Sequence, residues 1–133
     1  MLSRTAQYAV KAMIELSKLK DGELGCAACI AGRTGAPVNY LGKLLKLLTQ
    51  QGLLESRKGL NGGFHLARPA GEISLYDIAE PIDHVSRLGT CFFGDAECRQ
   101  ATRCAAHDGW QAVRDPFLSF LRDTTLEQLK DKQ

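Results

Sequence analysis

The first fifty residues alternate apolar and polar positions with the period of an α-helix. Residues 4–19 predict an amphipathic helix because apolar side chains return every three or four positions. These side chains are Ala6, Val10, Met13 and Leu16. Asp21 and Gly22 interrupt the pattern, and residues 26–34 predict a second, shorter helix that ends near Gly35.

Residues 39–51 predict a third helix with two distinct faces. One face is a stripe of leucines, formed by Leu41, Leu44, Leu45 and Leu48. The other face steps by four, three and four positions through Asn39, Lys43, Lys46 and Gln50. Such a helix can pack its leucines on a core and present amide and ammonium donors to a groove. A solvated surface face is the plainer interpretation of the same pattern.

A β-hairpin is predicted directly after this helix. Residues 53–57 can form a strand, and residues 64–67 can return beside it. Residues 58–63 form the turn between them, and Asn61 followed by Gly62 is a strong hairpin signal. Three helices followed by a basic-tipped hairpin predict a winged helix-turn-helix. The phosphate loop of an enzyme is excluded, because no strand–loop–helix context or Gly-Lys-Ser/Thr sequence surrounds the turn.

The C-terminal part of the chain predicts further helices around a cysteine-bearing stretch that lacks periodicity. Ser74 is expected to cap a short helix that Pro81 ends, and a long helix is expected over residues 107–122. Pro116 should kink the long helix or mark its first turn, and residues 124–127 carry a capping-box pattern. The apolar stripe of the long helix consists of Trp110, Val113, Phe117, Phe120 and Leu121. We interpret this stripe as a dimer interface, with packing inside one chain as the alternative.

Charge is distributed unevenly along the chain. Residues 1–70 hold ten Lys and Arg against four acidic residues, a net charge of +6, whereas residues 71–133 hold seven against eleven, a net charge of −4. The basic part suits a polyanionic partner, and Arg57 and Lys58 at the predicted turn can reach phosphates. Charged residues interrupt every apolar run near the N-terminus, so we expect no signal peptide, no membrane span and a cytoplasmic protein.

Five cysteines fall into two groups, which favours metal or redox chemistry over a disulfide framework. A Cys-x6-Cys-x5-Cys-x2-His spacing is formed by Cys91, Cys98, Cys104 and His107. Thiolates and imidazole suit zinc, copper(I) or an iron–sulfur cluster, and the spacing leaves these open, along with three unrelated free cysteines. We interpret Cys26 and Cys29 as small buried thiols on a helix, with a Cys-x-x-Cys redox pair as the alternative.

Several segments together resemble the Rrf family of bacterial winged-helix regulators, in particular its IscR-like and NsrR-like iron–sulfur members. These segments are residues 2–10, 39–41, 52–54 and 58–64, the three-cysteine loop, and residues 125–126. The resemblance covers essentially the whole chain, and the combination is more specific than any single segment.

The resemblance implies a homodimer that binds a palindromic operator in double-stranded DNA and holds a cluster on Cys91, Cys98 and Cys104. In IscR-like members a histidine three residues after the last cysteine is the fourth ligand, and His107 holds that position. NsrR-like members use an acid in the first helix, where this chain has no carboxylate near its start. The resemblance therefore favours His107, and a [2Fe–2S] over a [4Fe–4S] cluster. Two positions depart from the family: the first cysteine gap is one residue longer, and Gly42 replaces a glutamate of IscR-like members.

We therefore predict a mainly α protein with a winged helix-turn-helix DNA-binding domain in residues 1–80. Residues 81–133 are expected to form the cluster-binding loop and a long dimerisation helix. Predicted base contacts come from Asn39, Tyr40 and Lys43, and predicted phosphate or wing contacts from Ser3, Arg4, Lys46, Arg57, Lys58 and Asn61.

The predicted function is that of a non-enzymatic transcription regulator, a repressor or an activator. It would sense redox state, nitric oxide or iron and cluster status. The first alternative is a zinc-stabilised DNA-binding or protein-interaction module without cluster sensing. The second is a small thiol-redox enzyme that uses Cys26 and Cys29.

Overall fold

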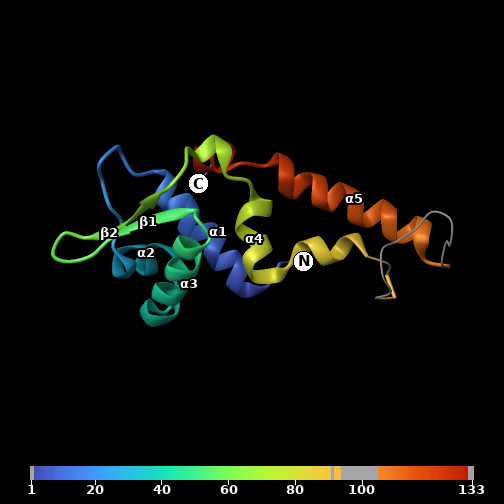
Figure 1. Ribbon diagram of the computed structural model, residues 1–133, viewed down its shortest axis with the longest axis horizontal. Helices are drawn as coiled ribbons and strands as arrows, with labels where there is room; N and C mark the ends of the chain where they lie inside the picture. The colour runs from blue at the N-terminus through green and yellow to red at the C-terminus, as the bar shows by residue number, and fades with distance from the viewer. Residues whose placement is uncertain (1, 91, 94–104, 132–133) are drawn as a thin grey trace.

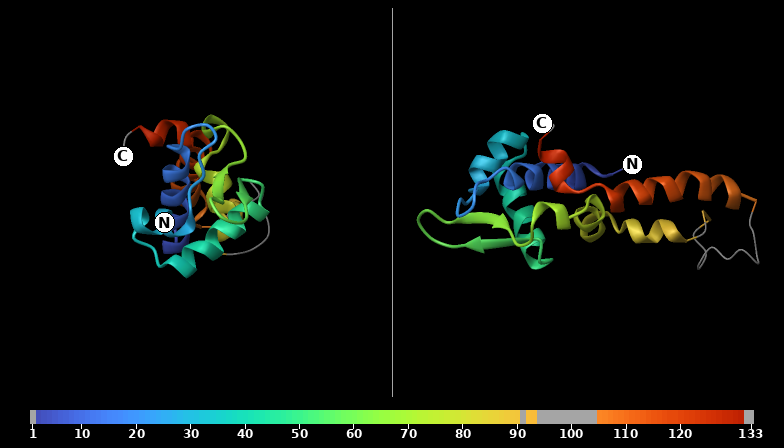
Figure 2. Two further views of the ribbon diagram at one scale, coloured as in Figure 1. Left: turned by 90° about the vertical axis from the view of Figure 1, so that its left-hand side faces the viewer. Right: turned by 90° about the horizontal axis from the view of Figure 1, so that it is seen from above.

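In the computed structural model, which describes residues 2–90, 92–93 and 105–131, the N-terminal helices and a β-hairpin pack together (Figure 1). One long helix, α5 (His107–Asp123), extends away from them. A view from above (Figure 2) shows the short 3-10 helix η2 (Val85–Gly89) running beside α5. The hairpin and the far end of α5 therefore lie at opposite ends of an elongated molecule.

The first three helices form where the hydrophobic periodicity predicts them. They are α1 (Arg4–Ser17), α2 (Ala27–Thr34) and α3 (Val38–Gln50). The C-cap of α2 is Gly35, whose φ of 79° lies in the left-handed region that glycine adopts without steric cost. All four leucines of the predicted α3 stripe are buried. The packing of this stripe fixes which face of α3 remains exposed.

A two-stranded antiparallel sheet follows α3. Strand β1 (Leu54–Arg57) pairs with β2 (Gly63–Leu66), with Leu54 opposite Leu66. These bounds confirm the predicted hairpin to within one residue at each strand.

Close backbone approaches shape the hairpin and attach it to the helices. Asn61 adopts a left-handed φ of 64° in the turn, and a side chain on Gly62 would overlap the carbonyl oxygen of Arg57. The main chain of Gly25 exchanges two hydrogen bonds with Phe64 in β2, each of 2.9 Å. The hairpin is therefore held against the segment that leads into α2.

Two prolines lie inside helices, and one of them corrects a predicted helix end. Helix α4 (Leu75–Asp83) continues past Pro81, so the prediction that Pro81 ends it is wrong. A proline close to the C-terminal end removes only one main-chain hydrogen bond, while the capping box at Ser74 and the buried face of α4 stabilise the rest. Pro116 lies inside α5 and not in its first turn.

Two hydrophobic clusters formed by described residues stabilise the fold. The larger one joins α1, α2, α3 and β1 to the terminal helix α6 (Leu126–Lys130), whose Leu126 is fully buried. Helix α5 runs back toward the N-terminal helices from its far end at His107, and α6 follows it and packs on α1. The smaller cluster joins α4, η2 and α5 through Leu75, Ala79, Val85, Leu118 and Leu121.

The architecture is mainly α-helical with a small sheet, in the order of a winged helix-turn-helix, as the sequence predicts. Across the parts of the chain that the structure describes, no helix combines the length and the apolar character needed to span a bilayer.

Candidate nucleic-acid interface and cluster segment

Helix α3 presents a polar face opposite its buried leucines. Asn39, Lys43 and Lys46 are exposed, Tyr40 is 36% exposed, and no acidic residue occurs in the helix. This face is positively charged and carries amide, ammonium and hydroxyl donors. Such a helix has the groups that read base edges and phosphates in a DNA groove.

Tyr40 at the start of α3 is held by two residues of α1. Its hydroxyl shares a hydrogen bond with the hydroxyl of Thr5, and its ring packs edge-on against Tyr8 with the centroids 5.9 Å apart. These contacts fix the Tyr40 ring relative to α1. Sequence reasoning missed Thr5 and Tyr8 in this role, because the contact joins residues far apart in the chain.

Ser3 forms hydrogen bonds within the chain. Its hydroxyl accepts a hydrogen bond from the Ala6 amide at 3.1 Å and donates one to the carboxylate of Asp83. The Ser3 amide also donates to Asp83, at 2.8 Å. Ser3 therefore joins the start of α1 to the end of α4, and its predicted contact with phosphate stays a prediction. Arg4, beside it, is exposed.

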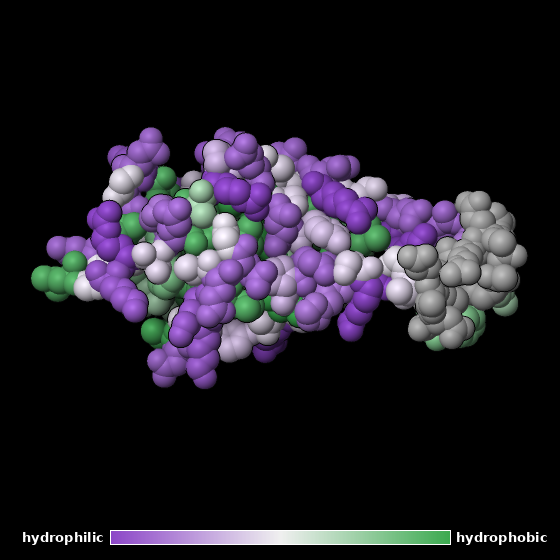
Figure 3. All heavy atoms as spheres, viewed as in Figure 1, coloured by the Kyte–Doolittle hydropathy of each residue, from purple (hydrophilic) through white to green (hydrophobic). Residues whose placement is uncertain are grey.

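A groove of about 590 Å³ separates α3 from the hairpin, and we call it the basic groove. Lys46 of α3 and Arg57 and Lys58 of the hairpin line it, and none of the described residues that line it is acidic. At the tip of the hairpin, Leu60 is 96% exposed. Figure 3 shows this tip projecting beyond the surrounding hydrophilic surface. The groove therefore gathers three of the predicted DNA contacts on one surface.

Cys26 and Cys29 form a disulfide, so their interpretation as buried thiols is wrong. Cys29 is exposed, and Cys26 is half-buried and lines the basic groove. Cys26 precedes α2 as its N-cap, and its Sγ accepts a hydrogen bond from the Cys29 amide at 3.0 Å. The first turn of the helix brings the two Cα atoms within 5.1 Å. The Cys-x-x-Cys spacing was the sequence signal for this pair.

Of the four predicted metal ligands, the structure describes only His107. Cys91, Cys98 and Cys104 lie outside the described residues. His107 is the first residue of α5 and is 3% exposed. Within the described ranges, no three His, Cys, Asp or Glu side chains gather into a group that could bind a metal ion.

The chain just before Cys91 lies against the first turn of α5. The indole Nε1 of Trp110 donates a hydrogen bond to the carbonyl of Thr90 at 3.1 Å. The Trp110 ring also packs against Phe92, with the centroids 5.7 Å apart. The segment that contains the cysteines therefore begins beside the helix that starts at His107.

Arg114 makes a second link on the same side of α5. Its Nη1 donates to the carbonyl of Gly89 at 3.5 Å, and its Nε donates to the carboxylate of Asp115 at 2.9 Å. The Arg114 hydrogen bond lowers the pKa of the Asp115 carboxyl below its ordinary value. Arg114 thus connects α5 to the end of η2.

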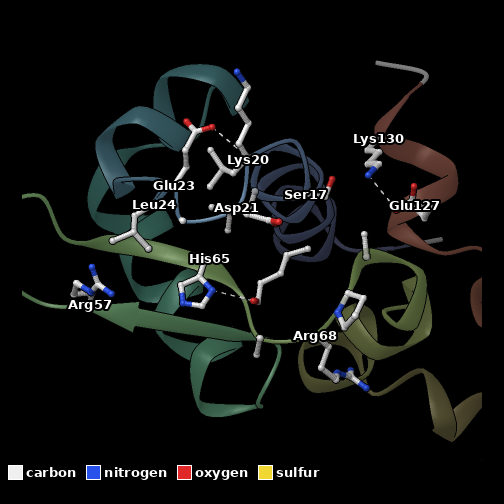
Figure 4. A pocket seen from close by; sticks show the side chains of 17 residues that line it. Ser17, Lys20, Asp21, Glu23, Leu24, Arg57, His65, Arg68, Glu127 and Lys130 are labelled. Atoms are coloured by element: carbon white, nitrogen blue, oxygen red, sulfur yellow. Dashed lines mark hydrogen bonds and ion pairs between the residues drawn. The ribbon is translucent and has the colours of Figure 1, made fainter.

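A second hollow, of about 520 Å³, lies between the α1–α2 connection, the hairpin and α6 (Figure 4). Its charges have both signs and several interact within the chain. The Lys20 amide donates to the Glu23 carboxylate at 2.9 Å, and Lys130 pairs with Glu127 at 3.1 Å. Because cations and anions are mixed here, we assign the nucleic-acid interface to α3 and the basic groove.

Comparison with known proteins identifies the family. The model of Rrf2, described as iron-dependent transcriptional regulators, matches residues 2–132. The chain belongs to the Rrf2 family. The regulator IscR of Vibrio atlanticus is 32% identical over 133 residues, which cover 99% of this chain and 76% of that protein. IscR of Cronobacter sakazakii is 29% identical over 132 residues, covering 99% and 81%.

Solved structures share the fold of this Rrf2-family protein over its whole length. CymR of B. subtilis, a global cysteine regulator, superposes with a TM-score of 0.84 at 26% identity and covers 100% of this chain and 98% of that one. IscR of T. potens gives a TM-score of 0.78 at 25% identity, covering 100% and 88%. These relatives are transcriptional regulators and not enzymes, so the predicted class of DNA-binding transcription regulator is confirmed.

Proposed function

We propose that this Rrf2-family protein senses its signal through an iron–sulfur cluster held by Cys91, Cys98, Cys104 and His107. Three thiolates and an imidazole are suitable ligands for such a cluster, and we favour the [2Fe–2S] form. When bound, the cluster supplies a group that responds to redox state, nitric oxide or iron supply. The description of the family as iron-dependent and the IscR relatives support the proposal.

The observation that carries the proposal is the position of His107. Its side chain is buried at the first residue of α5, three residues after Cys104. The contact between Trp110 and Thr90 brings the start of the cysteine segment to the same turn of the helix. The described residues on either side of this segment therefore lie at the same turn of α5, which supports a ligand set drawn from the segment and His107.

Packed side chains connect the C-terminal half of α5 to the recognition helix. Leu118 and Leu121 of α5 pack on α4, and Val10 of α1 contacts both hydrophobic clusters. Tyr8, also on α1, then contacts Tyr40 of α3. In our proposal a change at His107 shifts α5 as a rigid helix, and this shift changes the position of α3 through these contacts. A coupling of about 1–3 kcal/mol would change DNA affinity by about 5- to 150-fold.

We propose that α5 also pairs two copies of the chain. Val113 is 66% exposed and Phe120 is 55% exposed, and their spacing of two helical turns places both on one side of α5. Leu118 and Leu121 are buried against α4. Pairing would remove the exposed apolar side chains from water. A two-fold dimer would present two α3 helices to a palindromic operator.

The proposed DNA contacts divide between bases and phosphates. Base contacts come from Asn39, Tyr40 and Lys43, and phosphate or wing contacts come from Ser3, Arg4, Lys46, Arg57, Lys58 and Asn61. Ser3 and Arg4 lie at the start of α1 and would move with it, whereas Tyr40 is a contact on α3 that α1 holds directly through Thr5 and Tyr8.

The proposal is tested by anaerobic isolation of the protein. We expect bound iron and acid-labile sulfide together with the visible and Mössbauer spectra of a [2Fe–2S] cluster. Stoichiometric zinc instead, or a colourless protein even after anaerobic reconstitution, would contradict cluster binding. Neither result would bear on the proposed DNA contacts, which rest on other residues.

A pair of histidine variants tests the fourth ligand. His107→Ala should change or abolish the cluster spectrum, because one ligand is lost. His84→Asn is the matched control, since His84 is exposed at the left-handed end of α4, where asparagine is tolerated. An unchanged spectrum in His107→Ala would remove His107 from the ligand set.

A further inference from the structure

The Cys26–Cys29 pair has a place in the fold that the proposed function does not use. Both cysteines lie in or before the first turn of α2, and Cys26 lines the basic groove with Lys46, Arg57 and Lys58. Cys29 is exposed and Cys26 is half-buried. Both residues therefore lie where small thiols and disulfides can approach them from solvent.

The surroundings of Cys26 favour negative charge on its sulfur when the disulfide is reduced. The Cys29 amide donates to Cys26 Sγ at 3.0 Å, and the first turn of α2 contains no acidic residue. The positive end of the helix dipole also lies there. These are the conditions under which a Cys-x-x-Cys pair becomes a good nucleophile and exchanges with disulfides.

The pair is directly attached to the hairpin. Gly25, the residue before Cys26, exchanges two hydrogen bonds of 2.9 Å with Phe64 of β2. A side chain on Gly63 would come within 2.7 Å of the Gly25 carbonyl oxygen, so the two segments are in close contact. A change at Cys26 therefore acts at the junction between α2 and the hairpin.

We propose that Cys26 and Cys29 form a reversible dithiol–disulfide modification site whose oxidised form binds DNA more tightly. The DNA part of this inference rests on the proposed function. In the reduced form, negative charge on Cys26 would oppose phosphates in the basic groove. In the oxidised form that charge is absent, and the disulfide links the residue next to Gly25 to the first turn of α2.

The oxidant of the proposed thiol–disulfide exchange is a small disulfide such as glutathione disulfide. The Cys26 thiolate attacks one glutathione sulfur, and the glutathione S–S bond breaks to release one glutathione. The Cys29 thiolate then attacks the Cys26 sulfur of the mixed disulfide and releases the second glutathione. Two electrons pass from the protein to glutathione disulfide, and the two protein thiol protons end on the two released glutathiones. A small dithiol reverses the reaction.

The site is tested on the intact protein in glutathione buffers of graded redox potential, without DNA or iron. Samples are acid-quenched, alkylated and digested with trypsin, because peptide 21–33 contains Cys26 and Cys29 and no other cysteine. We expect this peptide to be alkylated at both cysteines in reducing buffers. In oxidising buffers it should carry no alkyl group and have a mass two hydrogens below that of the unmodified dithiol peptide, and the change should be reversible. In Cys29→Ser the reaction should stop at a glutathione adduct on Cys26. A peptide that is alkylated twice at every buffer ratio would overturn the site.

A second measurement tests the coupling to DNA. A duplex selected by the protein from a random pool is titrated with oxidised and reduced protein, and we expect at least about fivefold tighter binding by the oxidised form. A tenfold difference would lower the midpoint potential of the pair by about 30 mV when the duplex is saturating. The Cys26→Ser/Cys29→Ser variant keeps a residue suited to the N-cap and should lose the dependence on these buffers. Equal affinities would overturn the coupling, while failure to select any duplex would instead count against the proposed DNA interface.

Discussion

Replacing Gly62 by alanine should damage the hairpin specifically. The new methyl group would overlap the Arg57 carbonyl oxygen and lie 2.9 Å from the Gly59 carbonyl oxygen. Both are backbone atoms, so no side-chain rotation can relieve the contact. The hydrogen bond from the Gly62 amide to Gly59, 3.0 Å long, must break or shift.

The expected magnitude follows from these two effects. Overpacking costs about 1–3 kcal/mol and loss of the hydrogen bond about 0.5–1.5 kcal/mol. Lys58, Gly59 and Leu60 are exposed, so the turn can open without exposing the core. We therefore expect the free energy of unfolding to fall by only about 1–2 kcal/mol, because part of the cost is relieved by local opening.

Two assays check this prediction. Urea unfolding followed by circular dichroism gives the stability, and fluorescence anisotropy with a selected duplex gives the DNA affinity, which should fall as Arg57 and Lys58 lose their positions. Gly32→Ala is the matched control, because nothing lies within 4 Å of its added methyl group and it should stabilise α2 by about 0.5–1 kcal/mol. Parental stability and affinity in Gly62→Ala would refute the reasoning.

Three further variants test other parts of the molecule. Ser74→Ala removes the capping hydroxyl of α4 and should lower the free energy of unfolding in urea by about 1 kcal/mol; an unchanged midpoint would contradict this. Val113→Glu combined with Phe120→Glu should yield monomers in sedimentation velocity, whereas a persistent dimer would place the interface elsewhere. Trp110→Phe loses the hydrogen bond to Thr90, about 0.5–1.5 kcal/mol, so chelators should bleach the anaerobic protein about 2- to 10-fold faster. Parental bleaching would show that this link does not stabilise the cluster segment.

The helices and the hairpin could be predicted because their signals are local. The four leucines of α3 repeat at helical spacing, and burial of that stripe leaves only one face for solvent or DNA. The predicted helix end at Pro81 is wrong for a related reason: the local effect of proline is real, but the cap at Ser74 and the packing of α4 outweigh it. Local rules therefore located the helix correctly and placed its end too early.

Contacts between distant segments could not be predicted from spacing. The link from Ser3 to Asp83 spans 80 positions, and that from Thr5 to Tyr40 spans 35. Both depend on how α1 packs on its neighbours, which no single segment specifies. The same holds for the Trp110–Thr90 contact beside the predicted cluster ligands.

The residue at which α2 begins decides how Cys26 and Cys29 are interpreted. The sequence predicts Cys26 within a helix, where a small thiol is commonly buried. It precedes the helix instead, as the N-cap of α2, and this position leaves Cys29 on the exposed first turn. The Cys-x-x-Cys spacing indicated the pair, but its neighbours in the basic groove depend on how the hairpin packs.

The central claim is that the state of a cluster near His107 controls the DNA affinity of α3 and the basic groove. It is tested most directly by titrating one selected duplex, under anaerobic conditions, with cluster-loaded protein and with the same protein after the cluster is removed. We predict affinities that differ by about 5- to 150-fold. Equal affinities, with the cluster present in one sample and absent in the other, would contradict it.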